Sequence, residues 1–172
     1  MATILNKAGE VIVEDATKTL KELLEISRQI DLGGANLGGT DLAGVDLRRA
    51  NPLEAKAFGT DLRGANLSWT NLQGANLSEA HLGRVDLRHA RLVKADLRQV
   101  NLQGASLQGA DLREANLQGA DLRKANLQMV DLSEANLRHA NLDGVDLQGA
   151  NLRHANLDGT NLQGANLTGT TR

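Results

Sequence analysis

Cysteine and tyrosine are absent from this 172-residue sequence, and proline, phenylalanine and tryptophan occur once each, at Pro52, Phe58 and Trp69. Without cysteine, the chain can form neither a disulfide framework nor a metal site with thiolate ligands. With only two aromatic side chains it cannot build an aromatic core, so any interior has to consist of aliphatic side chains.

A strong charge of one sign and a long apolar run are also lacking. The formal net charge is −2, and the residues after position 29 carry 16 acids and 15 bases. Such a balance gives no overall field to attract nucleic acid or a membrane surface. No apolar run is long enough to cross a bilayer, and the opening residues, MATILNKAGEVIVEDA, lack the pattern of a secretory signal. We therefore expect a cytoplasmic protein that binds neither nucleic acid nor membranes directly.

Residues 1–29 differ in pattern from the rest of the chain. Val11 and Val13 alternate with polar residues, which predicts a short strand. The segment DATKTLKELLEISRQI has capping residues at its start and an apolar face, which predicts an amphipathic helix of about four turns. A strand and a helix of this size cannot form a core of their own, so we expect residues 1–29 to cap a larger unit.

From residue 30 onward the sequence consists of 28 consecutive five-residue units, and leucine occupies 26 of the 28 unit centres. These centres are positions 32, 37 and so on to 167. The residue two before each centre is usually Ala, and the residue directly before it is usually Asn or Asp. A repeat this regular decides the architecture before any secondary structure is assigned.

A period of five fits neither an α-helix nor a flat strand. On a helix, successive leucines would be rotated by about 140° and would spread around the circumference. On a strand they would alternate between the two faces. All leucines lie inside only if the chain turns in the same direction at every unit, with Asn, Asp and Gly at the turns. The centre residue and the residue two before it then point inward; examples of the predicted core are Leu72, Leu97, Leu117 and Leu137.

Runs such as GANLQGADLRKANLQ resemble the pentapeptide-repeat family, whose motif is A(D/N)LXX, and the resemblance covers about 140 residues. It implies an all-β fold, a right-handed quadrilateral parallel β-helix with four units, hence 20 residues, in each coil. Residues 30–172 would then form a solenoid of about seven coils, capped by the predicted strand and α-helix of residues 1–29.

The units at residues 50–59 depart from the repeat, because Pro52 and Ala57 occupy the centre positions. Pro52 cannot donate a ladder hydrogen bond, and Ala57 underfills the core. Leu53 or Phe58 would fill the gap by turning inward. The segment is a local bulge, a small loop or a protrusion that binds a partner.

No group of residues predicts catalysis, a cofactor or a metal site. A filled rod with convex sides offers no pocket for chemistry. Ser68 and His89 have no third residue to orient them, and His139 and His154 lie on different sides of a four-sided coil. Aspartates directly before the centres alternate between opposite sides and fit turn chemistry; examples are Asp111, Asp121 and Asp131. We therefore expect no enzyme activity and no cofactor.

With 20 residues in each coil, the resemblance places two columns of surface residues side by side. Arg49, Trp69 and His89 form one column, and Arg48, Ser68 and Arg88 form the other. An exposed tryptophan between cations is a common interface anchor, and cation–π attraction contributes about 0.5 to 2 kcal/mol. The predicted protein-binding patch consists of Arg48, Arg49, Trp69, Arg88 and His89.

We interpret the chain as a non-enzymatic protein-binding or scaffold module with an unidentified protein partner. The alternative is DNA mimicry, because the family that the chain resembles includes quinolone-resistance proteins that imitate duplex DNA and protect DNA gyrase, a topoisomerase. Mimicry asks for a strongly acidic surface, which the balanced charge does not supply. The leucine layer from Leu152 to Leu167 has no cap in the sequence, which predicts end-to-end pairing of two chains through their C-terminal coils.

Overall fold

The computed structural model describes residues 2–5, 11–15, 41–48 and 55–172. The N-terminal part is an antiparallel hairpin of β1 (Ala2–Leu5) and β2 (Val11–Asp15), with a register shift between Ile4 and Leu5. β2 coincides with the strand predicted from Val11 and Val13, whereas the sequence pattern gives no sign of β1. The predicted helix after β2 lies outside the described residues.

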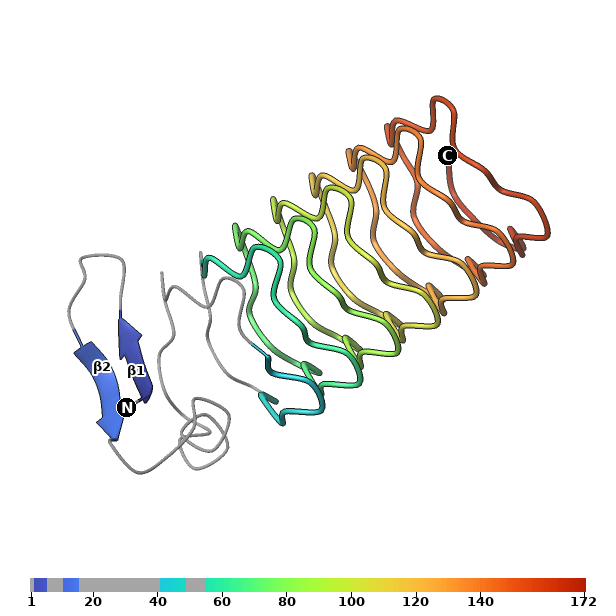
Figure 1. The fold of residues 1–172 in the computed structure, drawn as a ribbon. Helices are drawn as coiled ribbons and strands as arrows, with labels where there is room; N and C mark the ends of the chain where they lie inside the picture. The colour runs from blue at the N-terminus through green and yellow to red at the C-terminus, as the bar shows by residue number, and fades with distance from the viewer. Residues whose placement is uncertain (1, 6–10, 16–40, 49–54) are drawn as a thin grey trace.

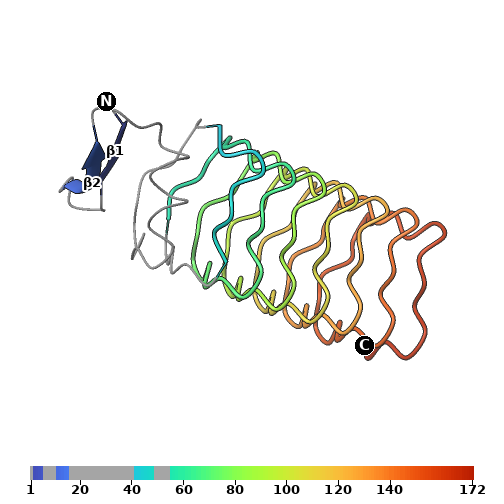
Figure 2. The same ribbon diagram turned by 90° about the horizontal axis from the view of Figure 1, so that it is seen from below.

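The rest of the described chain is a stack of coils held together by parallel bridges between residues that are 20 apart (Figures 1 and 2). Bridges such as Asp41↔Asp61, Asn66↔Asp86 and Asn151↔Thr171 follow one another along the whole stack. Twenty residues are four five-residue units, so each coil has four sides. The bridges therefore give the coil length that the resemblance implies.

Each unit turns the chain by the same local geometry. The N–H of Ala65, for example, donates to the carbonyl oxygen of Leu62 at 3.0 Å, and the intervening Gly64 has a φ of +65°. A bond between residues i and i+3 with a positive φ at i+2 is the arrangement of a type II turn. The Asn or Asp before the centre adds an Asx turn, as where Asn66 Oδ1 accepts from the backbone N–H of Ser68 at 3.1 Å. The residue two after each centre, here called the corner residue, therefore lies at a left-handed turn.

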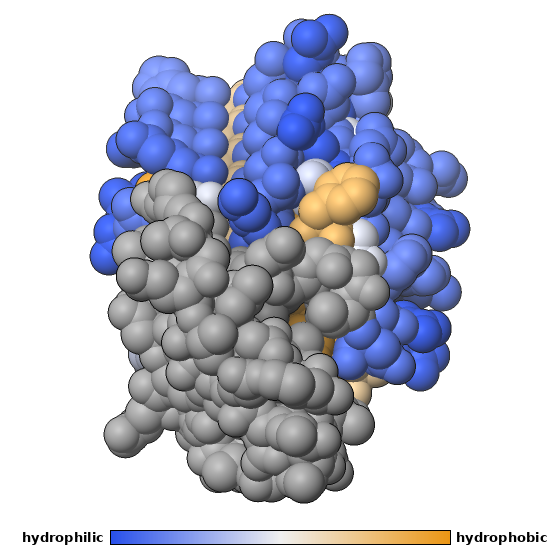
Figure 3. All heavy atoms as spheres, turned by 60° about the vertical axis from the view of Figure 1, so that its left-hand side comes forward, coloured by the Kyte–Doolittle hydropathy of each residue, from blue (hydrophilic) through white to orange (hydrophobic). Residues whose placement is uncertain are grey.

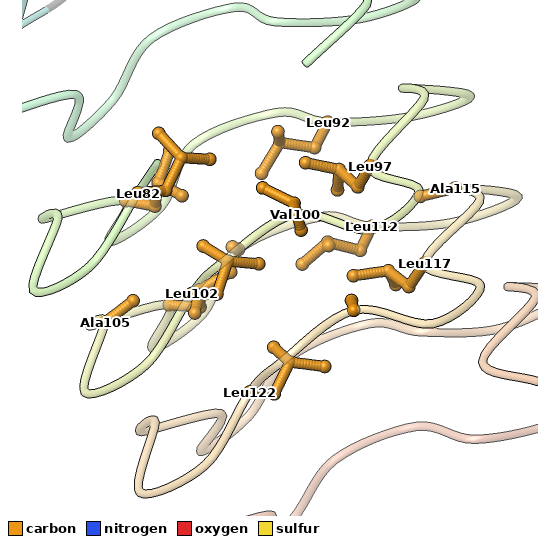
Figure 4. Packing of buried hydrophobic residues seen from close by; sticks show 14 of the residues in the cluster. Leu82, Leu92, Leu97, Val100, Leu102, Ala105, Leu112, Ala115, Leu117 and Leu122 are labelled. Atoms are coloured by element: carbon orange, nitrogen blue, oxygen red, sulfur yellow. The ribbon is translucent and has the colours of Figure 1, made fainter. Parts of the chain in front are cut away.

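The core lies along the axis of the stack and is aliphatic throughout (Figure 4). The predicted core residues Leu72, Leu97, Leu117 and Leu137 are buried, at 4%, 0%, 0% and 0% exposure. Ala and Val two before the centres are buried with them, such as Ala105, Ala115 and Val100. Leucines at the same position of successive coils stack on one another, as Leu82, Leu102 and Leu122 do. The prediction of an inward-facing pair of positions is confirmed.

Two details differ from the prediction. Phe58 is 49% exposed and does not turn inward, although Ala57 itself is buried. The chain accepts a smaller core residue there without an aromatic filler, while Pro52 and Leu53 lie outside the described residues. The residue directly after a centre is not always exposed, because Ser68 and Val93 are 6% and 7% exposed.

The C-terminal leucine layer is partly open, as predicted, except at Leu152. Leu152 is buried, at 3% exposure, and its backbone is paired with the start of the following coil, where its N–H donates to the carbonyl oxygen of Thr171 at 2.7 Å. Leu157, Leu162 and Leu167 are only partly buried. Along the sides of the stack the visible surface is mostly hydrophilic, with small apolar areas (Figure 3). No helix among the described residues has the length and apolarity needed to cross a membrane.

Candidate functional site

The tryptophan predicted to anchor a binding patch lies on one edge of the stack. Residues 69, 89, 109, 129 and 149 are corner residues of five successive coils, because the bridges join positions 20 apart. With the residue before each of them, and with Arg48 one coil earlier, they form the Trp69 edge, which consists of residues 48, 68–69, 88–89, 108–109, 128–129 and 148–149. The predicted columns therefore share one edge, with the exception of Arg49, which lies outside the described residues.

Trp69 and His89 form a stacked pair on this edge. Their ring centroids lie 4.3 Å apart with an interplanar angle of 25°. Trp69 is 60% exposed, so most of its ring remains available to a partner. The backbone fixes the spacing, since the N–H of Trp69 donates to the carbonyl oxygen of Arg88 at 3.0 Å. The indole is thus held on a rigid support while it is exposed to solvent.

The side chains of this edge lean toward the following coil. The His89 ring lies over Gly109, where an added Cβ would be 2.8 Å from the histidine Nδ1. Met129 lies over Gly149 in the same way, with its sulfur 2.6 Å from the position of an added Cβ. Both glycines also have a positive φ. Glycine at these two corners therefore serves the turn and leaves space for the side chain of the preceding coil.

The arginines of the predicted patch are bound to aspartates of their own units. Arg88 donates from Nε and Nη2 to the carboxylate of Asp86 at 2.9 Å and 2.6 Å, and Arg48 binds Asp46 in the same bidentate way. The Arg88 guanidinium holds the pKa of Asp86 below its usual value. The predicted cation–π contact is not formed among the described residues, where the only ring contact of Trp69 is with His89. The patch is accordingly an aromatic stack beside neutralised ion pairs.

Among the other polar candidates, Ser68 has a structural role and the two histidines lie apart from each other. Ser68 is buried and donates from Oγ to Asn66 Oδ1 at 2.8 Å, so it is not directed at His89 as a nucleophile. His139 lies over Gly159, and its column differs from that of His154. No group of metal-ligating side chains occurs in the described part of the chain.

The aspartates named above take part in turns, as predicted. Asp111 and Asp121 accept from the backbone N–H and the guanidinium two residues later. Asp131 accepts from the backbone N–H and hydroxyl of Ser133.

Two features of the surface have a signal in the sequence that the prediction did not use. The triplet Asp-Leu-Arg occurs six times from residue 41 onward, and each copy forms an ion pair across its leucine. The inward leucine leaves its two polar neighbours on the same outer side, so a spacing of two predicts the contact. Met129, which is 67% exposed, lies three coils after Trp69 on the same edge and follows from counting in steps of 20.

Comparison with known families agrees with this geometry. A family model described as pentapeptide repeats matches the chain in eight copies, over residues 28–64, 65–104, 90–128, 101–138 and 131–169. These segments cover nearly all of the repeat. Among curated proteins, none matches the chain significantly.

Several solved structures are similar to the chain. The pentapeptide-repeat protein Rfr23 from the cyanobacterium Cyanothece 51142 is 38% identical, with a TM-score of 0.52 over 55% of this chain and 63% of its own, so the chain spans less than two thirds of that relative. HetL from the cyanobacterium Nostoc sp. strain PCC 7120, involved in heterocyst differentiation regulation, is 30% identical, with a TM-score of 0.46 over 78% of this chain and 84% of its own. QnrB1, a plasmid-mediated fluoroquinolone resistance protein, is 22% identical, with a TM-score of 0.50 over 79% of this chain and 88% of its own.

Proposed function

Because the chain belongs to the pentapeptide-repeat family, with a right-handed β-helix fold, we propose that it is a non-enzymatic binding module whose Trp69 edge contacts a protein partner. The observation that carries this proposal is the exposed Trp69–His89 stack on a rigid backbone. Tryptophan is enriched among the residues that dominate binding energy at protein interfaces. Binding of a partner to this indole would cost this chain little conformational entropy, because the hydrogen bonds between coils already fix the backbone of the edge.

The composition of the edge indicates the kind of partner surface. Trp69 and Met129 supply apolar area three coils apart, while Arg48 and Arg88 are paired with carboxylates. A paired guanidinium attracts an acidic partner less than a free one does, since the adjacent carboxylate cancels its field at a distance. We therefore expect a partner that offers apolar pockets, with hydrogen-bond acceptors at the rim for the remaining guanidinium N–H groups.

We extend the proposal to the whole repeat as a quadrilateral solenoid of about seven coils, with residues 1–29 as its N-terminal cap. Twenty-residue bridges from Asp41 to Thr171 support the coil count, and the five-residue pattern continues back to residue 30. The cap is supported by the β1–β2 hairpin, which lies beyond the N-terminal end of the described coils (Figure 1). A cytoplasmic location and end-to-end pairing through the C-terminal coils stay predictions.

DNA mimicry directed at gyrase is the rival function, and the charge distribution argues against it. Six aspartates on the coils are paired with arginines of their own units, so their charge does not form an acidic stripe like that of a duplex. At 22% identity, the likeness to QnrB1 concerns the fold alone. Protection of DNA gyrase by a low concentration of the protein in a supercoiling assay would favour the rival.

The test of the Trp69 edge is an affinity capture from the native host with two matched variants. We expect the Trp69→Ala, Arg88→Ala double variant to lose the partner that the wild-type chain retains. The control is Glu79→Ala with Arg98→Ala, which changes the positions ten residues later, on another edge. A partner retained equally by both variants would contradict the assignment of the Trp69 edge.

A further inference from the structure

A groove lies along another edge of the stack, one unit before the Trp69 edge in each coil. Its volume is about 700 Å³, and its lining includes Arg63, Gly64, Gly83, Arg84, Gly104 and Lys124. Residues 64, 84, 104 and 124 are corner residues of four successive coils, since the bridges join residues 20 apart. The groove therefore runs along the axis of the rod and crosses several coils.

The floor of this groove is made of backbone. Gly64 and Gly104 have positive φ values of +65° and +67°, which is the turn geometry of every corner. Gly83 has no such φ, and an added Cβ there would have its nearest neighbours at 3.9 Å. A Cβ at Gly64 would meet nothing within 4 Å. At Gly104 an added Cβ would lie 3.7 Å from Cγ of Arg84, so the stem of that side chain lies over the glycine. The space is therefore open at Gly64, where an extended chain can approach the backbone closely, and is bordered by the arginine stems at Gly83 and Gly104.

The sides of the groove carry three cations, and two of them form no ion pair with the described acids. Arg63 is bound to Asp61, like the other arginines of Asp-Leu-Arg triplets. Arg84 and Lys124 are exposed, and neither forms an ion pair with any of the described acids. By contrast, Lys94 on another edge has Glu114 of the next coil at 3.4 Å. The groove thus holds two unneutralised cations at corresponding positions, two coils apart.

We propose that this groove binds an acidic, extended segment of a partner protein, with its carboxylates at Arg84 and Lys124 and its backbone over the glycine floor. Strand spacing in a stack is about 4.8 Å, so two coils separate the backbones of these cations by about 10 Å. A polyproline II segment advances about 3.1 Å per residue with three residues per turn. Acidic residues three apart then lie on one face of the peptide about 9 Å from each other, which matches the cation spacing.

An acidic peptide suits this groove better than a nucleic acid does. Two unneutralised cations release few counterions, whereas nucleic-acid binding depends on the release of many. The chain as a whole carries a net charge of −2, and Asp143 in the coil after Lys124 places an acid on the same edge. A nucleic-acid backbone that continued along this edge would be repelled by the Asp143 carboxylate. A short acidic peptide that spans only Arg84 and Lys124 would end before Asp143. This surface is separate from the Trp69 edge, so the inference does not depend on the function proposed for that edge.

The test measures fluorescence anisotropy of a labelled peptide of three Glu-Pro-Pro repeats with the full chain at about 50 mM salt. We expect saturable binding below about 1 mM, absent for the matching Gln-Pro-Pro peptide. Arg84→Gln with Lys124→Gln should weaken binding about tenfold, because two exposed charge contacts are lost. The matched control, Lys94→Gln with Arg153→Gln, removes the same charge from another edge and should leave binding within about twofold.

A second variant tests the position of the peptide without removing a cation. Gly83→Glu adds a carboxylate in the groove at a position where the nearest neighbours of an added Cβ are 3.9 Å away, so the fold should be retained, as circular dichroism can verify. This variant should also weaken binding of the Glu-Pro-Pro peptide by about tenfold. Equal loss in the control variant, binding of the neutral peptide, or no binding by the wild-type chain would overturn the proposal. Tighter binding of a short DNA duplex that also depends on Arg84 and Lys124 would overturn it in favour of a nucleic-acid site.

Discussion

Replacing Leu117 by alanine tests the central layer of the stack. Leu117 has 0% exposure and lies between Leu97 and Leu137, which occupy the same position in the coils before and after it. Its N–H donates to the carbonyl oxygen of Asn136 in the following coil at 2.7 Å. The N–H of the adjacent Asn116 donates to the carbonyl oxygen of Ala95 in the preceding coil at 2.9 Å. The backbone at Leu117 is therefore held from both neighbouring coils.

This double attachment decides the size of the effect. Leucine-to-alanine changes in protein cores cost about 2 to 5 kcal/mol, and the cost is greatest where the surroundings cannot collapse into the cavity. Closing the cavity at Leu117 would require two coils to approach, against hydrogen bonds that already have lengths of 2.7 to 2.9 Å. We therefore expect Leu117→Ala to lower the free energy of unfolding by about 3 to 5 kcal/mol.

The assay is urea unfolding followed by far-ultraviolet circular dichroism, with Leu162→Ala as the matched control. Leu162 has the same chemistry but is only partly buried, so its truncation should cost about 1 kcal/mol. Fluorescence of Trp69, the single tryptophan, reports on an early coil, and its transition should coincide with that of circular dichroism if the stack unfolds as one unit. An effect of Leu117→Ala no larger than that of Leu162→Ala would refute the layered core.

Two further predictions concern the corners and the ion pairs. Gly109→Ala should lower the free energy of unfolding by about 1 to 2 kcal/mol, because position 109 has a positive φ and an added Cβ would contact the His89 ring. Gly83→Ala, at a position without these constraints, should change it by less than about 0.5 kcal/mol. Thermal melts of the two variants give the comparison. Arg63 lowers the pKa of Asp61 to about 2, below its unfolded value of about 4. The stability from this pair is therefore complete above pH about 4 and lost as the pH falls through about 2, and Arg63→Gln should raise the pKa of Asp61 in an NMR titration and flatten this part of the stability profile.

The sequence predicts the core because the core depends only on spacing. Leu97 and Leu117 are buried for the same reason, namely that the chain turns equally at every unit, and one period in the sequence expresses that turn. The hairpin strand β1 has no such signal, since Ala2–Leu5 is too short for an alternation to be recognised. The burial of Val93 also has no signal in its own unit, because Val93 stands at a position that the repeat places outside.

The candidate site was predictable in position but not in its contacts. Counting in steps of 20 places Trp69 beside His89, and the structure brings their rings together. The same counting does not predict that Arg88 turns to Asp86 rather than to the indole. The two contacts compete for the same guanidinium. The bidentate ion pair with Asp86 lies within one unit, while a cation–π contact with the indole would remove the guanidinium from the Asp86 carboxylate.

The lean of the corner side chains limits what an edge of this rod can display. On the Trp69 edge a long side chain at a corner covers the corner of the next coil, and the covered corner carries glycine or a ring that stacks, as Gly109 and His89 do. Two bulky groups on one edge are then either in direct contact, like Trp69 and His89, or separated by a glycine coil, like His89 and Met129. The available spacings are multiples of about 4.8 Å. Since the inward positions form the core without these corner side chains, substitutions at positions 84, 89, 124 or 129 should alter the proposed binding surfaces while the leucine layers remain intact.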